Sequence, residues 1–310
     1  MSRRVVTVFG ASGFLGRHLV KRLVKEGFII RAAVRDVDAA LFLKTMGDVG
    51  QVVIVQANIA NPASVAAAIE GADAAVNLVG ILVERGRRTF QRLHADGPAY
   101  LAAAAARAGL GRLVQVSAIG ADAESESAYA RTKASGEAMA RTAFPEVTVV
   151  RPSVVFGPED RFFNLFAAMT RCLPALPLIG GGATRLQPVY AGDVAQAICR
   201  ILASPETRGQ TYELGGPKIY TFRQLMEMML AEIHRRRPLV PVPFAMASIE
   251  AWFLEKTPWP LLTRDQVKLL KRDNVVASSA LSLDALGIAP TPLEAILPTY
   301  LARYRPAGAL

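Results

Sequence analysis

A tyrosine and a lysine stand four residues apart, at Tyr129 and Lys133. On an α-helix this spacing places both side chains on the same face. The tyrosine hydroxyl can then serve as a general acid or base, while the lysine charge lowers the pKa of that hydroxyl and its ammonium group binds a ribose. Such a pair suits hydride transfer. Two residues at this spacing occur often by chance, so their weight depends on the elements that position them.

A glycine-rich segment near the N-terminus offers a different chemistry, the binding of phosphates. Gly10, Gly13 and Gly16 form a G-x-x-G-x-x-G pattern between a β-branched run and a helical pattern. Gly10 permits a tight turn, Gly13 lets the backbone approach a pyrophosphate, and Gly16 lets the helix pack close to the sheet. The phosphates would then lie on free N–H groups at a helix N-terminus. We expect cofactor contacts throughout this turn, from Gly10, Ala11, Ser12, Gly13, Phe14, Leu15 and Gly16.

Two arginines indicate which dinucleotide this turn prefers. Enzymes that use NAD carry Asp or Glu at the end of the second strand, where it accepts a hydrogen bond from the ribose 2′-hydroxyl. This chain has Arg35 there instead, and Arg17 directly follows the last glycine. Two guanidinium groups suit a 2′-phosphate, because arginine offers a planar fork of donors. We therefore expect NADPH (NADP), while Asp36 next to Arg35 leaves NAD(H) open.

The strands and helices that would hold these residues alternate through the first half of the chain. β-Branched and apolar runs predict strands at Val5–Phe9, Phe28–Val34, Val52–Gln56, Ala74–Val79, Leu113–Ser117 and Val147–Arg151. Helical patterns lie between them, at Phe14–Lys25 and Pro98–Ala108 among others. Buried strands that alternate with helices predict βαβ units. The expected fold class is α/β, a Rossmann doubly wound parallel sheet with helices on both faces.

Residues at the ends of these strands complete the expected cofactor site. Asn58, after the third strand, could hydrogen-bond the adenine, and Asn77-Leu78-Val79-Gly80, at the end of the fourth, would pass beneath the nicotinamide ribose. Either segment could equally be an ordinary strand-end turn. Besides the glycine turn and the two arginines, the expected contacts are Asn58, Ile59, Leu78, Val79, Gly80, Ser117, Tyr129, Lys133, Pro152 and Val155.

The regular alternation ends after Pro152, where Pro and Gly become frequent and short elements follow irregularly. We expect residues 1–152 to form a Rossmann dinucleotide-binding domain and residues 153–310 a smaller C-terminal α/β lobe for substrate or docking, with some later segments returning to the main sheet. Within this lobe, Val240–Trp259 is rich in aromatic and apolar residues and is bracketed by basic ones. It suits a membrane interface or a partner groove, or it completes the core of the lobe.

Other polar residues are assigned structural roles. Asp193 is expected to cap a helix that begins near Val194, and Glu159 and Asp160 to be loop or cap residues rather than catalytic carboxylates. The histidines are scattered on predicted helices without an evident partner. We assign no catalysis to His18, His94 and His234.

Composition and charge exclude several classes of protein. Two cysteines without a C-x-x-C pattern argue against a disulfide framework and a structural zinc site, so we expect no metal. The 36 basic and 26 acidic residues give a formal net charge of +10, which favours a nucleotide, an anionic lipid or an acidic protein face as partner. Nucleic acid is the weaker interpretation, because the basic residues are scattered and no binding motif accompanies them. No apolar run reaches the roughly 20 residues of a membrane-spanning helix.

The glycine turn with Tyr129 and Lys133 resembles the extended short-chain dehydrogenase/reductase superfamily, the NAD-dependent epimerases and dehydratases. The resemblance implies a Ser or Thr well upstream of the tyrosine, which hydrogen-bonds the substrate carbonyl. Here the strand-end serine is Ser117, only twelve residues before Tyr129. This departure puts the third catalytic residue in doubt, and Ser117 would be vestigial. The resemblance still implies one possible function, that of a working NAD(P)-dependent reductase, epimerase or dehydratase that acts on a sugar nucleotide or a small carbonyl compound.

A second resemblance covers nearly the whole chain. It rests on residues 8–17, 114–119, 129–137, 143–145, 151–164, 187–194, 262–267 and 286–294. These segments are similar to the nucleotide-binding accessory subunits of respiratory complex I, the NADH:ubiquinone oxidoreductase alpha subcomplex. The C-terminal segments carry the most weight, because generic epimerases are not expected to share them.

This second resemblance implies a structural or assembly role in which NADPH is held without turnover. It also implies docking onto other complex I subunits in the peripheral arm near the membrane, with lipid contact as a further option. Because a strand begins by Arg4, we expect no presequence. The expected location is the cytoplasmic face of a bacterial inner membrane, with peripheral attachment, or the matrix side if the chain is a processed mitochondrial one.

Overall fold

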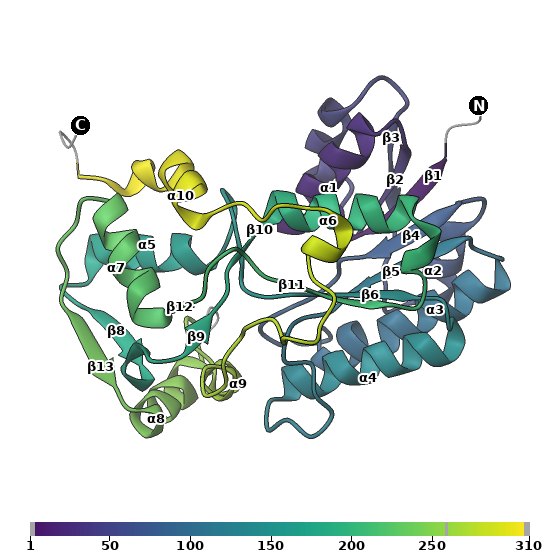
Figure 1. The fold of residues 1–310 in the computed structure, drawn as a ribbon. Helices are drawn as coiled ribbons and strands as arrows, with labels where there is room; N and C mark the ends of the chain where they lie inside the picture. The colour runs from purple at the N-terminus through teal and green to yellow at the C-terminus, as the bar shows by residue number, and fades with distance from the viewer. Residues whose placement is uncertain (1–3, 258–259, 307–310) are drawn as a thin grey trace. The chain divides into compact units, whose positions relative to one another are not determined.

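The computed structural model describes residues 4–257 and 260–306. The chain divides into two compact units (Figure 1). The first unit comprises Met1–Pro152, Ala191–Glu213 and Ser279–Ile288. The second comprises Ser153–Tyr190, Leu214–Ser278 and Ala289–Leu310.

A seven-stranded sheet forms the centre of the first unit, in the order β11-β6-β5-β4-β1-β2-β3. Its strands are β1 (Val5–Phe9), β2 (Ile29–Val34), β3 (Val52–Gln56), β4 (Ala74–Asn77), β5 (Arg112–Val116), β6 (Thr148–Pro152) and β11 (Thr211–Leu214). Every pairing among β1 to β6 is parallel. The order from β3 to β6 is that of a Rossmann fold, in which the chain reverses direction across the sheet between β1 and β4. The predicted fold class is confirmed.

The strands form where the sequence is apolar on both sides. Val6 and Val8 of β1, Ile30 of β2 and Val76 of β4 have no exposed surface. A strand that is covered on both faces needs apolar residues at successive positions, which distinguishes it from a strand with one wet face. β1 and β3 have the predicted bounds, and the other four predicted strands differ by one or two residues at their ends.

Helices cover both faces of this sheet. α1 (Phe14–Lys25) packs against α6 (Ala191–Ala203), and α3 (Gly97–Arg107) packs against α2 (Pro62–Ile69) and α4 (Ala128–Ala143). Figure 1 shows these two groups on opposite sides of the strands.

The helix that Asp193 was expected to precede begins earlier than predicted. The helix α6 already includes Ala191 and Gly192, so Asp193 is buried within its first turn and does not precede it.

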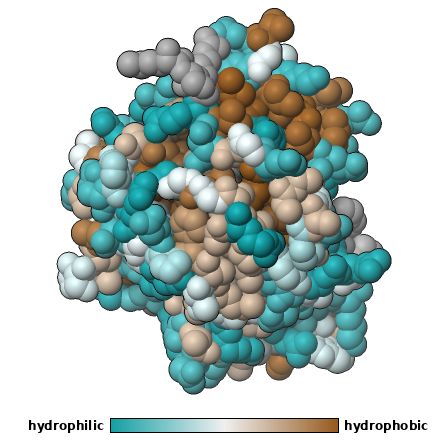
Figure 2. All heavy atoms as spheres, turned by 90° about the vertical axis from the view of Figure 1, so that its right-hand side faces the viewer, coloured by the Kyte–Doolittle hydropathy of each residue, from teal (hydrophilic) through white to brown (hydrophobic). Residues whose placement is uncertain are grey.

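Seen from the side that Figure 2 faces, hydrophilic and hydrophobic side chains are interspersed over the lower part of the surface, and hydrophobic ones gather towards the top. The first unit exposes several large hydrophobic side chains, among them Leu41, Phe42 and Val53.

The second unit has its own core and short elements. Three two-stranded sheets pair β7 (Val155–Phe156) with β10 (Val189–Tyr190), β9 (Arg185–Leu186) with β12 (Tyr220–Thr221), and β8 (Leu176–Ile179) with β13 (Leu239–Val242). Its helices are α5 (Phe162–Cys172), α7 (Phe222–Glu232), α8 (Phe244–Leu254), α9 (Arg264–Leu269) and α10 (Leu293–Leu301). Phe156, Phe163 and Phe222 are fully buried in the largest cluster of this unit.

Asp160 joins two helices of the second unit. One carboxylate oxygen accepts from the Phe163 and Asn164 amides at 2.7 and 3.3 Å, which caps α5. The other accepts from the Tyr300 hydroxyl of α10 at 2.5 Å. Burial raises the pKa of this carboxyl group. The expectation of a cap residue is confirmed for Asp160, and Glu159 is exposed in the same loop.

Candidate functional site

The glycine turn lies at the carboxyl end of β1, next to the point where the strand order reverses. Gly10 has a φ of 79°, which a side chain rarely tolerates, and a Cβ there would come within 3.3 Å of the Leu78 backbone. A Cβ on Gly16 would lie 2.3 Å from the Gly10 carbonyl oxygen, so only glycine lets α1 begin this close to the strand. Two of the three glycines are thus required by the backbone. Gly13 is the exception, with a φ of −74°.

The N-terminus of α1 has a partial positive charge that no side chain neutralises. Gly13 is the N-cap residue, so no side chain caps the helix, and its first turn holds no acidic residue. The first amides of a helix have no intrahelical acceptor and lie at the positive end of the helix dipole. Together with the tight turn, this end of α1 can bind an anion such as a pyrophosphate.

Asp36 and Arg17 make different local contacts. The Asp36 carboxylate accepts from the Ala39 amide at 3.0 Å, in the turn that leads into η1 (Asp38–Met46). Arg35 is exposed directly after β2. The Arg17 guanidinium lies 4.9 Å from the centre of the Phe42 ring and donates to the Ser12 carbonyl at 3.4 Å. Arg17 is therefore held beside the glycine turn, while one oxygen of Asp36 serves the local backbone.

The segment after β4 is fixed by Asn77, the buried last residue of that strand. The Asn77 side chain accepts from the Val79 amide at 3.0 Å and donates to Gln115 at 2.9 Å. The Leu78 amide donates to the Phe9 carbonyl at 3.0 Å, which extends the pairing of β4 with β1. Leu78 and Val79 are half-buried and Gly80 is exposed. This segment therefore follows the glycine turn along the same edge of the sheet.

Asn58 forms an ordinary strand-end turn. Its side-chain oxygen accepts from the Ala60 amide at 3.1 Å, and its backbone N–H donates to the Ser64 hydroxyl at 3.0 Å. The side chain is exposed, so its amide nitrogen can still reach a ligand. Ile59 is buried, and its side chain would lie 2.9 Å from a Cβ on Gly97. Ile59 therefore packs against the start of α3.

Ser117, Tyr129 and Lys133 belong to the carboxyl end of β5 and the start of α4. Lys133 is only 6% exposed, and its ammonium donates to the Val116 carbonyl at 3.4 Å and lies 5.8 Å from the centre of the Tyr129 ring. Ser117 follows Val116 directly, and its buried hydroxyl has no hydrogen-bond partner among the described residues. A buried ammonium with one long bond and an orphaned hydroxyl leave donors for a ligand. These residues fit a dinucleotide.

Lys133 predicts a pH dependence. Burial lowers the pKa of its ammonium group to about 8, against the opposing charge of Glu137. The charged form therefore dominates below that pH and the neutral amine above it, so dinucleotide affinity should fall about tenfold between about pH 7 and pH 9. Fluorescence titrations of a reduced dinucleotide across this range measure the effect. The Lys133→Met variant should bind weakly at every pH without this slope, and a slope that persists in it would refute the assignment to Lys133.

His94 lies beside the tyrosine and lysine, contrary to the expectation that the histidines lack partners. It is 1% exposed, its ring is 5.1 Å from the Tyr129 ring at an angle of 86°, and its Nε2 accepts from the Ile81 amide at 3.0 Å. It stands on the π-helical turn η2 (Gln91–Asp96), which runs into α3. A π-helical turn has no clear sequence pattern, so the position of His94 beside Tyr129 could not be predicted from the sequence.

Two further expected contacts, Pro152 and Val155, follow from the end of β6, the parallel neighbour of β5. Pro152 ends β6, where its carbonyl accepts from the Ile119 amide at 3.1 Å. Val155 belongs to β7 in the second unit, paired with Val189. Cofactor contact by Val155 stays a prediction.

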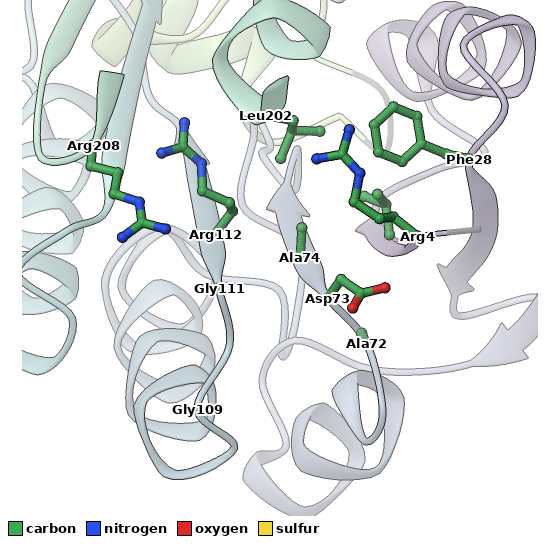
Figure 3. A pocket seen from close by; sticks show the side chains of 11 residues that line it. Arg4, Phe28, Ala72, Asp73, Ala74, Gly109, Gly111, Arg112, Leu202 and Arg208 are labelled. Atoms are coloured by element: carbon green, nitrogen blue, oxygen red, sulfur yellow. The ribbon is translucent and has the colours of Figure 1, made fainter. Parts of the chain in front are cut away.

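A cavity of about 420 Å³ opens at the amino ends of β1, β4 and β5, away from the glycine turn (Figure 3). Arg4, Arg112 and Arg208 line it. Arg112 donates to the Ile201 and Ser204 carbonyls at the end of α6, and burial together with the charge of Arg208 lowers its pKa. In a parallel α/β sheet the negative helix ends gather at this edge. Arg112 therefore caps a helix, and the cavity carries less weight than the glycine turn.

Metal binding and membrane spanning find no support in the described residues. No group of three or more His, Cys, Asp or Glu side chains is placed there to hold a metal ion. No helix within residues 4–257 and 260–306 is long and apolar enough to cross a bilayer. Cys172 is exposed and Cys199 buried, and both are free thiols.

The sheet order, the glycine turn and the Tyr129–Lys133 pair together define a dinucleotide-binding protein of the Rossmann class. The model of the NAD dependent epimerase/dehydratase family matches residues 6–215. Among solved structures, a dTDP-glucose 4,6-dehydratase from Streptomyces venezuelae, crystallised with NAD and TYD, has a TM-score of 0.73 at 21% identity and covers 97% of this chain and 96% of its own. That likeness shows the fold.

Relatives with a similar sequence identify a narrower family within this one. The mitochondrial NADH dehydrogenase (ubiquinone) 1 alpha subcomplex subunit 9 of Arabidopsis thaliana is 37% identical over 98% of this chain and 79% of its own length. The mitochondrial NADH-ubiquinone oxidoreductase 40 kDa subunit of Neurospora crassa is 35% identical over 96% of this chain and 79% of its own. The chain belongs to the NAD dependent epimerase/dehydratase family and, within it, to the family of complex I alpha subcomplex subunit 9. Both resemblances seen in the sequence are confirmed.

Proposed function

We propose that the chain is a peripheral accessory subunit of respiratory complex I that binds NADPH without turning it over. One observation carries the proposal. The epimerase family model ends at residue 215, but the likeness to complex I subunits covers 98% of the chain and so includes most of the second unit. The epimerase family model accounts for residues 6–215 alone. Other complex I subunits are the partners that this likeness supports.

The cofactor would be held by the residues of the first unit. The amides of residues 10–16 bind the pyrophosphate, Arg17 and Arg35 the 2′-phosphate, and Lys133 with Tyr129 the nicotinamide ribose. Asn58 and Ile59 flank the adenine, and Leu78, Val79, Gly80 and Ser117 flank the nicotinamide. The nicotinamide ring, when bound, supplies a hydride donor or acceptor. Ser117 stands only twelve residues before Tyr129, which leaves little chain to enclose a substrate and supports binding without turnover.

A tightly bound dinucleotide would stabilise the fold directly. A ligand present at 100 times its dissociation constant adds about 2.7 kcal/mol to the free energy of unfolding. Typical domains have a total of about 5–15 kcal/mol. Occupancy of the site would therefore decide a large share of the stability, which gives a non-catalytic cofactor a physical purpose in assembly.

The native mass of the assembly tests the proposal. Membranes that contain the chain are solubilised in a mild detergent and separated under native conditions. We expect the chain to migrate with NADH:ubiquinone oxidoreductase activity, in a particle far larger than its own 33.2 kDa. Migration only as a free chain or a small oligomer would contradict the proposal.

The two arginines predict the cofactor preference. The Arg17→Ala/Arg35→Asp double variant loses both guanidinium groups and gains a carboxylate that can accept from a ribose 2′-hydroxyl. Because a charge-assisted hydrogen bond contributes about 1.5–3 kcal/mol, the ratio of NADPH to NADH affinity should fall about 100-fold. Parallel titrations with the two dinucleotides measure the ratio. An unchanged ratio would show that neither arginine binds the 2′-phosphate.

A second candidate function is a working reductase, epimerase or dehydratase on a sugar nucleotide or small carbonyl compound. The observation in its favour is that Tyr129 and Lys133 remain side by side, with the pKa of Lys133 lowered to about 8. This function predicts oxidation of NADPH by the purified chain with a carbonyl substrate, and loss of that activity in Tyr129→Phe.

The helix α8 supports contact with an anionic lipid surface, as part of the same proposal. Only Ala247 and Ala251 of this helix are buried. Met246, Ile249, Trp252 and Phe253 are between 42% and 62% exposed. The one charged residue of this helix is the exposed Glu250. An exposed apolar surface of this kind is typical of contact with protein or lipid. Trp259, which the sequence analysis included in this segment, lies outside the described residues.

Basic side chains accompany this helix within the second unit. The Lys256 ammonium lies 3.5 Å from the centre of the Trp252 ring, and Lys268, Lys271 and Arg272 follow in the next segment. Aromatic side chains beside cations suit the interface of an anionic membrane. We propose attachment to the membrane that carries complex I, on the cytoplasmic face in a bacterium or on the matrix side in a mitochondrion.

Vesicle binding checks this surface. The Trp252→Ser/Phe253→Ser variant should co-sediment with phosphatidylglycerol vesicles at least about tenfold less than the unaltered chain, because two interfacial side chains are lost. Leu41→Ser, at an exposed hydrophobic position of the first unit, is the matched control and should bind as the unaltered chain does. Equal sedimentation of both variants would mean that α8 meets protein instead of lipid.

A further inference from the structure

His94 occupies a position that regular helix geometry would not give it. The turn η2 (Gln91–Asp96) is π-helical and continues into α3. π-Helical turns make up well under 1% of residues and are frequent at functional sites. The backbone of this turn approaches α4 closely, since a Cβ on Gly136 would lie 1.8 Å from the His94 carbonyl oxygen. Glycine at 136 is therefore what allows the turn to lie against α4.

The hydrogen bonds of the ring define its protonation. Nε2 accepts from the Ile81 amide at 3.0 Å, so it carries no proton. Nδ1 lies 3.5 Å from the Thr132 hydroxyl oxygen, and that hydroxyl lies within donating distance of the Ala128 and Tyr129 carbonyls. The network thus assigns the Nδ1–H tautomer. Burial, and then the charge of Lys133, lower the pKa of His94 to about 2.

Two aromatic rings hold the imidazole in place. Phe90 stacks on it at 5.3 Å, and Tyr129 meets it edge-on at 5.1 Å. Phe90 and Tyr129 also touch, at 5.9 Å and 84°. Rotation of the Tyr129 ring is therefore restricted from two sides by side chains that lie on the π turn or just before it.

The same imidazole borders the segment expected to pass beneath the nicotinamide ribose. A Cβ on Gly80 would lie 3.8 Å from His94 Nε2 and 3.5 Å from the Lys133 ammonium nitrogen. The backbone at Gly80 is thus flanked by a neutral acceptor and a buried cation. An imidazolium could not accept from the Ile81 amide, and it would place a second positive charge beside Lys133.

We propose that His94 is a positioning residue of the nucleotide site, which as a neutral acceptor fixes the 79–81 backbone and orients the Tyr129 ring toward the nicotinamide ribose. The inference rests on the proposed binding of a dinucleotide. It assigns to one histidine the coupling of three elements: the end of β4, the π turn and α4.

Two variants distinguish this role from simple packing. His94→Gln can present a carbonyl oxygen at the reach of Nε2, whereas His94→Leu fills the space without an acceptor. We expect NADPH to bind about tenfold more weakly to His94→Leu and within about threefold of the unaltered chain to His94→Gln. The amide proton of Ile81, followed by nuclear magnetic resonance, should lose its hydrogen-bonded chemical shift in the leucine variant alone.

The unaltered chain supplies a measurement that no folding defect can obscure. The ¹⁵N shifts of His94 should show an unprotonated Nε2 from about pH 5 to pH 8, because the ring stays neutral throughout. Titration of His94 near its ordinary 6.5, or equal NADPH affinity of His94→Leu and the unaltered chain, would overturn the positioning role and leave the proposed function intact. Failure of the unaltered chain to bind either NADPH or NADH would overturn the proposed function itself, and this inference with it.

Discussion

Replacing Gly13 with aspartate is expected to weaken dinucleotide binding about 100-fold or more while leaving the unliganded chain at least as stable. This loss corresponds to about 2.8 kcal/mol of binding free energy. Gly13 is the N-cap residue of α1, and its φ of −74° and ψ of 179° suit any residue. A Cβ there meets only the Gly10 carbonyl oxygen, at 3.2 Å. This contact is tight, so the Gly10 carbonyl must shift by a few tenths of an ångström, a cost that the new cap is expected to offset.

Aspartate at position 13 is expected to stabilise the unliganded chain and to destabilise the complex with a dinucleotide. In the unliganded chain it accepts from the first amides of α1 and interacts with the positive end of the helix dipole, which adds about 0.5–1 kcal/mol. With a dinucleotide present, the same carboxylate occupies the amides that the pyrophosphate needs and repels its charge. Binding titrations and thermal unfolding without ligand measure the two effects separately. Gly13→Ser is the control, because it adds a cap without a charge and should lose much less affinity.

Two results would contradict the assignment of the pyrophosphate to the N-terminus of α1. Unchanged NADPH affinity in Gly13→Asp would mean that the phosphates do not lie at this helix end. A large loss of unliganded stability would mean that Gly13 has a packing role that the backbone geometry does not indicate.

Replacing Arg151 with methionine should lower the free energy of unfolding by about 3 kcal/mol. The Glu137 side chain is 7% exposed, and Arg151 donates to it twice, with the closer nitrogen–oxygen distance at 2.6 Å. Glu213 lies 3.5 Å from the same guanidinium. Removal of one partner from a buried ion pair costs about 3–5 kcal/mol, because an uncompensated charge remains. We expect a cost at the lower end of this range, because the Arg151 side chain is 27% exposed and water screens the ion pair.

The matched control removes both charges. Glu137→Met/Arg151→Met leaves no uncompensated carboxylate at position 137 and should be less destabilised than Arg151→Met alone, as urea unfolding can show. A double variant that loses as much as the sum of both single variants would indicate independent packing contributions in place of an ion pair. Glu137 also raises the pKa of Lys133, so this pair helps to keep the lysine charged in the candidate site.

The fold of the first 150 or so residues could be predicted because its signals are local. Apolar runs such as Val5–Phe9 mark strands that are buried on both faces, and the glycine spacing marks the turn that follows. Glycine at position 16 is required by the backbone of residues 10 and 11, and the φ of 79° at Gly10 belongs to the turn itself. Both requirements are local and can be inferred from the spacing. The cofactor arginines and the Tyr129–Lys133 pair follow from the same local patterns.

The remainder of the site depends on contacts between distant segments. Asn77 meets Gln115, and His94 meets Ile81 and Tyr129, across 13 to 38 positions of sequence. Neither the residue types nor their spacing in the sequence predicts these contacts. Gly136 was the available signal, since a glycine inside a helix usually has a packing reason. The helix α6 and the strand β11 show the same limit, because nothing near residue 191 indicates that the chain returns to the first sheet.

The most direct test of the whole account is the nucleotide content of the native complex. Complex I that contains this chain is purified under mild conditions, denatured and analysed for NADPH, NADP and NADH, before and after sustained oxidation of NADH. We expect NADPH in an amount equal to that of the chain, unchanged by turnover. A complex that contains the chain without a dinucleotide, or whose NADPH is consumed while NADH is oxidised, would contradict it.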